Sequence, residues 1–241
     1  MKSVLITGGT RGLGLALTRE VAGAGYHAIA AARRPSDELN SLADEDLPGR
    51  VSFAELDLAE SGSLQAFARD LFNKNNSIDA LVNNAAIGLD GVLATMHDSE
   101  IERLVRVNVT GTILLTKYIC RPMLAQRGGR IINIASIIGH TGFSGLSVYA
   151  ATKGAMLSFT KSLSRELGKA NITVNSVSPG FLETDMTSSI ESDKLEQIRR
   201  RSPSGRLASL ADVAATVLFL LSDAASSVNG QDIVVDAGSI A

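Results

Sequence analysis

The sequence contains little that could cross-link the chain or hold a metal ion. It has one cysteine, Cys120, and three histidines, His27, His97 and His140, which are scattered along the chain. A lone cysteine excludes an intramolecular disulfide, and the apolar neighbours of Cys120 favour a buried thiol over a catalytic one. The histidines have no metal-ligand spacing. We therefore expect a fold that needs neither a disulfide nor a metal.

Long hydrophobic runs and a strong charge of either sign are also missing. No apolar run approaches the roughly 20 residues that a membrane span requires, and the first residues lead into a short strand rather than a signal peptide. The net charge of −2 gives no overall attraction to nucleic acid or to an acidic membrane. We expect a cytoplasmic protein that binds neither.

Short apolar runs alternate with stretches of helical periodicity along the 241 residues. The expected strands are residues 4–7, 28–32, 51–53, 80–82, 130–134, 172–177 and 233–235. The clearest expected helices are residues 13–24, 61–72, 99–126, 149–167 and 211–221. This alternation is typical of a parallel sheet covered on both faces, and no linker divides the chain. We predict an α/β fold, a Rossmann-type doubly wound parallel sheet of seven strands in a single domain over residues 1–241.

A glycine-rich loop follows the first expected strand and reads Thr7-Gly8-Gly9-Thr10-Arg11-Gly12-Leu13-Gly14. Glycine permits a tight turn and close approach of the backbone to a pyrophosphate, and the next helix offers free N–H groups. The spacing departs from G-x-G-x-x-G, and the G-K-[ST] of a Walker loop is missing. A tight strand–helix turn also uses glycine, so the loop's place after the first strand decides for dinucleotide binding.

The charges after the second expected strand indicate which dinucleotide binds. An NAD site usually has a carboxylate there for the ribose 2′-hydroxyl, but the chain reads Arg33-Arg34 and has no acid before Asp37. Arg33, together with Arg11 of the glycine loop, can pair with a 2′-phosphate. The alternative is that both are solvated loop arginines. We predict NADP(H).

Four residues form the candidate catalytic group. Tyr149 and Lys153 are four residues apart, on one face at the start of an expected helix. An adjacent ammonium group lowers a tyrosine pKa from its ordinary value near 10. Ser136 follows the fifth expected strand, where its hydroxyl can bind a substrate oxygen. Asn108 lies in a long apolar helix, where its amide needs partners; taken alone, it is more simply a structural asparagine.

At this point the chain resembles the short-chain dehydrogenase/reductase family over essentially its whole length. The shared features are Thr7-Gly8-xxx-Gly12-x-Gly14, Asn83-Asn84-Ala85, Asn108, Ser136, Tyr149, Lys153, and Pro179-Gly180 followed by Thr184. The resemblance implies that Tyr149 is the general acid in reduction and that Ser136 orients the carbonyl. Lys153 would bind ribose and lower the pKa of Tyr149. Asn108 would hold a water of a proton relay through its backbone carbonyl.

The same resemblance implies a cofactor-binding set. Asp57 would contact the adenine, Asn84 and Ala85 the adenine-side ribose, and Leu182 and Thr184 the nicotinamide carboxamide. The full set is Gly8, Thr10, Arg11, Gly12, Leu13, Gly14, Arg33, Asp57, Leu58, Asn84, Ala85, Tyr149, Lys153, Pro179, Gly180, Leu182 and Thr184. One departure is Ala86, where the family usually has glycine. We expect this alanine to be tolerated while tightening the turn.

Within the family, residues 178–186 look most like those of the 3-oxoacyl-[acyl-carrier-protein] reductases. This similarity implies a 3-oxoacyl thioester on an acidic carrier protein, docked by basic residues near the active-site mouth, of which Arg127 and Arg130 match one place. The second place holds Ala170 beside Lys169, and Leu146 replaces a frequent glutamine. The alternatives are an NADPH-dependent reductase of free ketones and, in a different class, a non-enzymatic NADP(H) sensor, which would tend to lack the tyrosine or lysine.

Further expectations concern two loops and the assembly. Residues 137–148 should shape the substrate pocket, where His140 and Phe143 either contact substrate or pack within the loop. Residues 187–206 correspond to the family's mobile lid, and arginines 199–201 are either a solvated helix end or an attraction for an anionic carrier. The family also implies a homotetramer, formed through residues 99–126, residues 149–167 and the C-terminal strand.

Overall fold

A seven-stranded parallel sheet forms the centre of the molecule, which a computed structural model describes for residues 1–183, 196–197, 199–200 and 202–241. Its order is β3-β2-β1-β4-β5-β6-β7. The strands are β1 (Ser3–Thr7), β2 (His27–Ala32), β3 (Arg50–Glu55), β4 (Ala80–Asn83), β5 (Gly129–Ile134), β6 (Ile172–Pro179) and β7 (Asp232–Val235). The chain runs outward from β1 to β3 and returns to pair β4 with β1. The resulting switch point lies at the carboxyl ends of these strands, where doubly wound sheets bind ligands.

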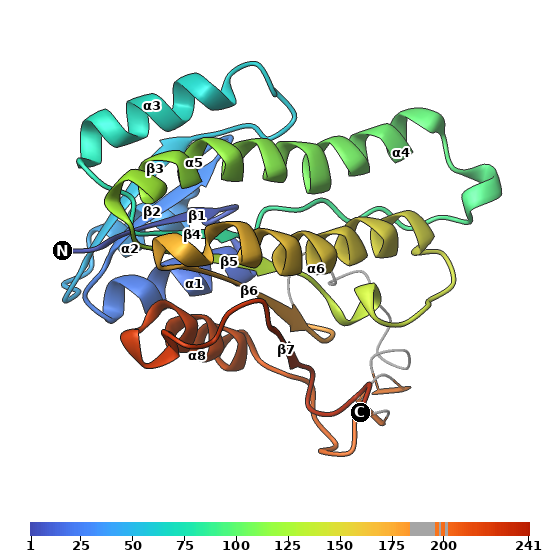
Figure 1. Cartoon of the computed structure of the whole chain (residues 1–241). Coiled ribbons are helices and arrows are strands. Elements are labelled where there is room, and N and C mark those ends of the chain that lie inside the picture. The colour runs from blue at the N-terminus through green and yellow to red at the C-terminus, as the bar shows by residue number, and fades with distance from the viewer. Residues whose placement is uncertain (184–195, 198, 201) are drawn as a thin grey trace.

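Helices cover both faces of this sheet (Figure 1). They are α1 (Gly12–Gly23), α2 (Asp37–Ala43), α3 (Leu64–Asn75), α4 (Asp98–Val105), α5 (Thr112–Gln126), α6 (Ser147–Leu167) and α8 (Leu210–Leu221). α1 and α8 pack on one face, and α3, α5 and α6 on the other. Because both faces are covered, β1 and β4 are buried at every position. The predicted fold class is confirmed. Within the described ranges, no helix combines the length and the apolar character needed to cross a membrane.

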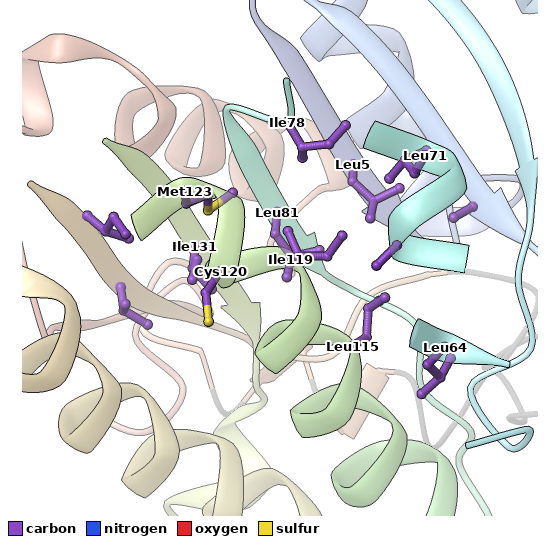
Figure 2. Packing of buried hydrophobic residues seen from close by; sticks show 14 of the residues in the cluster. Leu5, Leu64, Leu71, Ile78, Leu81, Leu115, Ile119, Cys120, Met123 and Ile131 are labelled. Carbon is purple, nitrogen blue, oxygen red and sulfur yellow. The ribbon is translucent and has the colours of Figure 1, made fainter. Parts of the chain in front are cut away.

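The packing of α5 shows how the sequence pattern builds the larger core. Leu115, Ile119, Cys120 and Met123 recur at helical spacing and pack with Ile131 of β5 (Figure 2). Burial of Cys120 raises the pKa of its thiol. The thiol is therefore a packing group of low reactivity.

The expected helix at 99–126 is not regular along its length. α4 ends at Val105, a π-helical turn named η2 occupies Arg106–Gly111, and α5 begins at Thr112. A π turn widens the helix locally and often marks a functional site. Asn108 lies within it. The other expected helices differ from the structure by shifts at their ends, the largest being α3, which begins at Leu64 rather than at residue 61.

Candidate active site

Ser136 and Tyr149 meet at the carboxyl edge of the sheet. β5 ends at Ile134, and Ser136 caps the one-turn helix η3 (Ile137–Gly139) by accepting a hydrogen bond from the Ile138 amide at 3.2 Å. α6 starts at this edge, so that Tyr149 lies in its first turn. The Ser136 side chain lies close enough to the Tyr149 hydroxyl to lower the pKa of the phenol. The structure therefore brings together two of the four predicted catalytic residues directly.

The pKa of Tyr149 differs from our expectation. Burial raises it to about 12, and the hydrogen bond with Ser136 is the contact that lowers it. Lys153 does not lower the pKa of Tyr149 as we expected. Its ammonium group lies 5.7 Å from the Tyr149 ring centroid and donates to another partner, the Ile134 oxygen. The phenol is thus fully protonated at neutral pH, which is the state required of a proton donor.

Lys153 is buried, with 5% of its surface exposed, and its Nζ donates to the main-chain oxygen of Ile134 at 2.8 Å. Burial lowers its pKa to about 8. Lys153 lies one helical turn from Tyr149, and its hydrogen bond to Ile134 offsets part of the free energy that burial of the charge costs. At neutral pH most of the molecules carry the charge.

The Asn108 side chain connects the loop after β4 to α6. Its Oδ1 accepts from the Ile87 amide at 2.9 Å, and its Nδ2 donates to the Ile87 oxygen at 2.9 Å and to Thr152 Oγ1 at 3.2 Å. The Thr152 hydroxyl in turn donates to the Tyr149 carbonyl at 2.8 Å. The amide thus has the partners that burial requires, and Thr152, which we did not predict, links it to the tyrosine helix.

The glycine loop leaves no room for a side chain at Gly9 or Gly14. A Cβ on Gly14 would lie 1.9 Å from the Gly8 oxygen, and Gly8 and Gly12 have φ of +67° and +52°. The first turn of α1 holds no acidic residue, and its N-cap, Arg11, makes no side-chain capping bond. The positive end of α1, including the amides near Leu13, is thus left for an anion. This cradle fits the pyrophosphate of a dinucleotide.

Asn84 and Ala85 lie against this loop. Asn84 Nδ2 donates to the Thr7 oxygen at 2.9 Å, and the Thr7 hydroxyl accepts from the Asn84 and Ala85 amides at 3.0 and 2.9 Å. The Thr7 hydroxyl therefore joins the ends of β1 and β4 at the switch point. From the sequence, Thr7 was expected only as part of the glycine motif. Its hydroxyl has this structural role because β1 and β4, which are distant in sequence, pair in the sheet.

Two of the predicted adenine-side residues, Asp57 and Leu58, lie in the turn after β3. Asp57 Oδ1 accepts from the Ala59 amide at 2.9 Å, which shapes the turn after β3. Leu58 is buried, and a Cβ on Gly111 would lie 2.2 Å from its oxygen. Gly111 thus lets the Asn108 π turn approach this loop. It was missed because a glycine inside an apolar helix carries no distinctive signal.

The two arginines predicted to select NADP(H), Arg11 and Arg33, are both exposed, and the loops that carry them are in contact. Ser36 Oγ donates to the Thr10 oxygen at 2.7 Å, which ties the segment after β2 to the glycine loop. Arg11 and Arg33 form no ion pair with any residue that the structure describes. Both guanidinium groups are therefore available to an anion beside the loop.

The nicotinamide-side residues are described only in part. β6 ends at Pro179, and the Gly180 amide donates to the Val235 oxygen at 2.9 Å. A Cβ on Gly180 would lie 2.7 Å from the Asp236 Cβ. Leu182 packs against the core cluster beneath α8. Thr184 and most of the expected lid lie outside the described residues.

The basic residues expected near the active-site mouth lie at the opposite edge of the sheet from Ser136. Arg127 and Lys169 are in contact, with Arg127 donating to the Lys169 oxygen at 3.2 Å. They precede β5 and β6, at the amino ends of these strands, whereas Ser136 follows the carboxyl end of β5. Arg130 is largely buried and lies 3.7 Å from Asp223. The expected position is therefore wrong within one chain, because α5 runs back along the sheet away from the site.

The chain is similar to known proteins in both sequence and structure. A family model described as Enoyl-(Acyl carrier protein) reductase matches residues 8–239. The 3-oxoacyl-[acyl-carrier-protein] reductase FabG of Aquifex aeolicus (strain VF5) is 38% identical, covering 98% of this chain and 96% of that protein. FabG of Chlamydia pneumoniae is 36% identical with the same coverage. A variant of actinorhodin polyketide ketoreductase, solved with NADPH, superposes with a TM-score of 0.91 at 29% identity, covering 99% of this chain and 97% of that one.

The parallel sheet, the glycine cradle, the half-buried serine and tyrosine and the buried lysine define the class as a dinucleotide-dependent oxidoreductase. The chain belongs to the short-chain dehydrogenase/reductase family. It is an enzyme that acts on a CH–OH or C=O group with a nicotinamide cofactor.

Proposed function

We propose that this enzyme reduces the 3-oxo group of an acyl thioester, carried by acyl carrier protein, to the 3-hydroxy form with NADPH. The observation that carries the chemistry is the placement of the Ser136 side chain beside the Tyr149 hydroxyl, with Lys153 one helical turn away. The names of relatives at 38% and 36% identity support the substrate class. The exposed arginines at positions 11 and 33 support NADPH.

The residues of the site divide the work of ketone reduction. Ser136 would hold the carbonyl oxygen, where negative charge develops. Tyr149 would donate the proton from its Oη to that oxygen. Lys153, charged at neutral pH, would hold a ribose hydroxyl and stabilise the phenolate that the proton transfer leaves behind. Asn108 fixes the helix that carries the tyrosine.

The cofactor residues fit this scheme. The glycine loop would hold the pyrophosphate, Asp57 with Asn84 and Ala85 the adenosine, and Pro179 to Thr184 the nicotinamide end. Bound NADPH would supply the hydride to the carbonyl carbon. Arg11 and Arg33 would bind the 2′-phosphate through charge-assisted hydrogen bonds.

A comparison of substrates and cofactors tests this proposal. We expect acetoacetyl-carrier protein to be reduced with a higher kcat/KM than the same ketone without the carrier, and NADPH to be preferred to NADH. Equal turnover of the free ketone would favour the alternative, a reductase of free ketones, which is supported by the replacement of a basic residue at Ala170. A KM for NADH equal to or below that for NADPH would contradict the cofactor assignment.

We also propose that the enzyme is a homotetramer. Exposed apolar side chains support this, because Val105 of α4, Leu124 of α5 and Val234 of β7 are 42%, 41% and 39% exposed on the expected interface elements. Light scattering on the protein eluting from a size-exclusion column should give a mass four times that of one chain. A monomer at micromolar concentration would contradict the proposal.

A further inference from the structure

A polar cluster outside the residues assigned so far lies beside the Ser136 turn. His140 follows η3, and its Nε2 lies 2.8 Å from Asp232 Oδ2 and 3.2 Å from Ser178 Oγ. Asp232 begins β7, and its Oδ1 accepts from Ser176 Oγ at 2.6 Å and from Ser178 Oγ at 2.9 Å. The Asp232 carboxylate therefore links β7, which carries it, to β6 and to the turn that contains His140.

The hydrogen-bond donors in this cluster can be assigned. Asp232 can only accept, and Ser178 gives its hydroxyl proton to Asp232. Both neighbours of His140 Nε2 are thus acceptors, so this nitrogen must carry a proton and donate it. The contact therefore persists whether the imidazole is neutral or charged.

Serine, histidine and aspartate together also suggest a nucleophilic triad, but the geometry excludes one. A triad uses one imidazole nitrogen for the serine and the other for the carboxylate, whereas here Nε2 meets both. Ser178 is also fully buried, at 0% exposure. The cluster is a structural contact rather than a second reactive centre.

The η3 turn is held from a second side by the catalytic helix. A Cβ on Gly139 would lie 3.1 Å from the Gly154 nitrogen and 3.1 Å from the Lys153 carbonyl carbon. Gly139 therefore packs directly on the α6 backbone at the catalytic lysine. His140, the next residue, fixes the opposite end of the turn to β6 and β7.

We propose that His140 is a positioning residue: its contact with Asp232 and Ser178 fixes the turn that carries the Ser136 hydroxyl. The turn is short, with the Gly139 amide donating to the Ser136 oxygen at 2.9 Å and the His140 amide to the Ile137 oxygen at 2.9 Å. A shift of His140 is thus transmitted to Ser136 within one turn. The proposal rests on the proposed function in that Ser136 orients the substrate carbonyl.

Three variants test the proposal. His140→Ala removes the donor, and His140→Gln keeps an N–H near the position of Nε2. Ser222→Ala is the matched control, because its hydroxyl donates to a main-chain oxygen of its own turn, that of Phe219 at 2.7 Å, at the end of α8. We expect His140→Ala to lower kcat about tenfold or more, since small misplacements at an active site cost up to about 100-fold. NADPH affinity should stay within about twofold. His140→Gln should recover most of the rate, and Ser222→Ala should resemble the wild type.

Hydrogen exchange supplies a readout that needs no turnover. The amides of residues 138–140 should exchange faster in His140→Ala than in the wild type, His140→Gln or Ser222→Ala. If the wild type reduces no ketone, the proposed function fails, and exchange alone decides whether His140 holds the turn. Unchanged exchange in His140→Ala, or an unchanged kcat in an active enzyme, would overturn the positioning role. So would equal losses in the alanine and glutamine variants.

Discussion

The Lys153 ammonium group donates to the main-chain oxygen of Ile134, the last residue of β5, at a distance of 2.8 Å. This bond attaches α6, which carries Tyr149, to the strand that leads to Ser136. It also places a charge where water is excluded, which burial makes costly. Lys153 therefore connects the geometry of the site to the stability of the protein, and this connection can be measured.

Replacement of Lys153 by Met should change how stability depends on pH. The displacement of its pKa from 10.5 to about 8 corresponds to about 3 kcal/mol of cost for the buried charge. Between these values the unfolded chain binds a proton that the native protein does not, so wild-type stability rises with pH. Lys153→Met lacks this rise.

The difference in unfolding free energy between Lys153→Met and the wild type should therefore fall by about 2 kcal/mol from pH 7 to pH 9.5, as measured by denaturant titration. Lys161→Met, an exposed lysine of the same helix, serves as the control and should show no such trend. A constant difference for Lys153→Met would mean that the buried lysine has an ordinary pKa.

Tyr149→Phe should remove the proton donor while keeping the ring. We expect ketone reduction to fall at least about 100-fold, the usual scale for losing a general acid. NADPH binding, followed by fluorescence, should change by less than about twofold, because the phenol hydroxyl faces Ser136. Tyr118→Phe on α5 should leave both unchanged. Surviving turnover in Tyr149→Phe would refute the assignment of Tyr149.

Arg33→Ala should weaken the use of NADPH but not of NADH. Loss of charge-assisted hydrogen bonds to a phosphate costs about 1.5–3 kcal/mol, or about 10- to 100-fold in kcat/KM for NADPH. The adjacent exposed Arg34 is a matched control, since Arg34→Ala removes the same charge one position away. Steady-state kinetics with both cofactors would separate the two. Equal effects of Arg33→Ala and Arg34→Ala would indicate a general electrostatic attraction only.

The sequence predicted the strands, their parallel arrangement and the edge that bears Ser136, because these follow from local patterns. It did not reveal the π turn at Asn108, since one inserted residue leaves the apolar pattern on either side helical. It also gave no sign of α2, whose seven residues bury only Leu39 and Leu42. Both features depend on contacts with distant segments.

Two properties of the site arise only from tertiary packing. The pKa of Tyr149 is set mainly by burial, which spacing from Lys153 does not report. The His140–Asp232 contact joins residues 92 positions apart and exists because β7 pairs with β6. The residue types alone indicated the chemistry, whereas the pKa of Tyr149 and the His140–Asp232 contact follow only from the folded structure.

Two alanine substitutions on α1 should separate cofactor binding from helix propensity. Gly14→Ala would place a Cβ 1.9 Å from the Gly8 oxygen, so the loop must shift. We expect a loss of about 1–3 kcal/mol in unfolding free energy, the usual cost of overpacking, and weaker NADPH binding by calorimetry. A Cβ on Gly23, at the other end of the helix, meets nothing within 4 Å. Gly23→Ala should therefore add up to about 1 kcal/mol of stability without changing affinity. If Gly14→Ala bound NADPH as tightly as Gly23→Ala, the glycine loop would not be the pyrophosphate cradle.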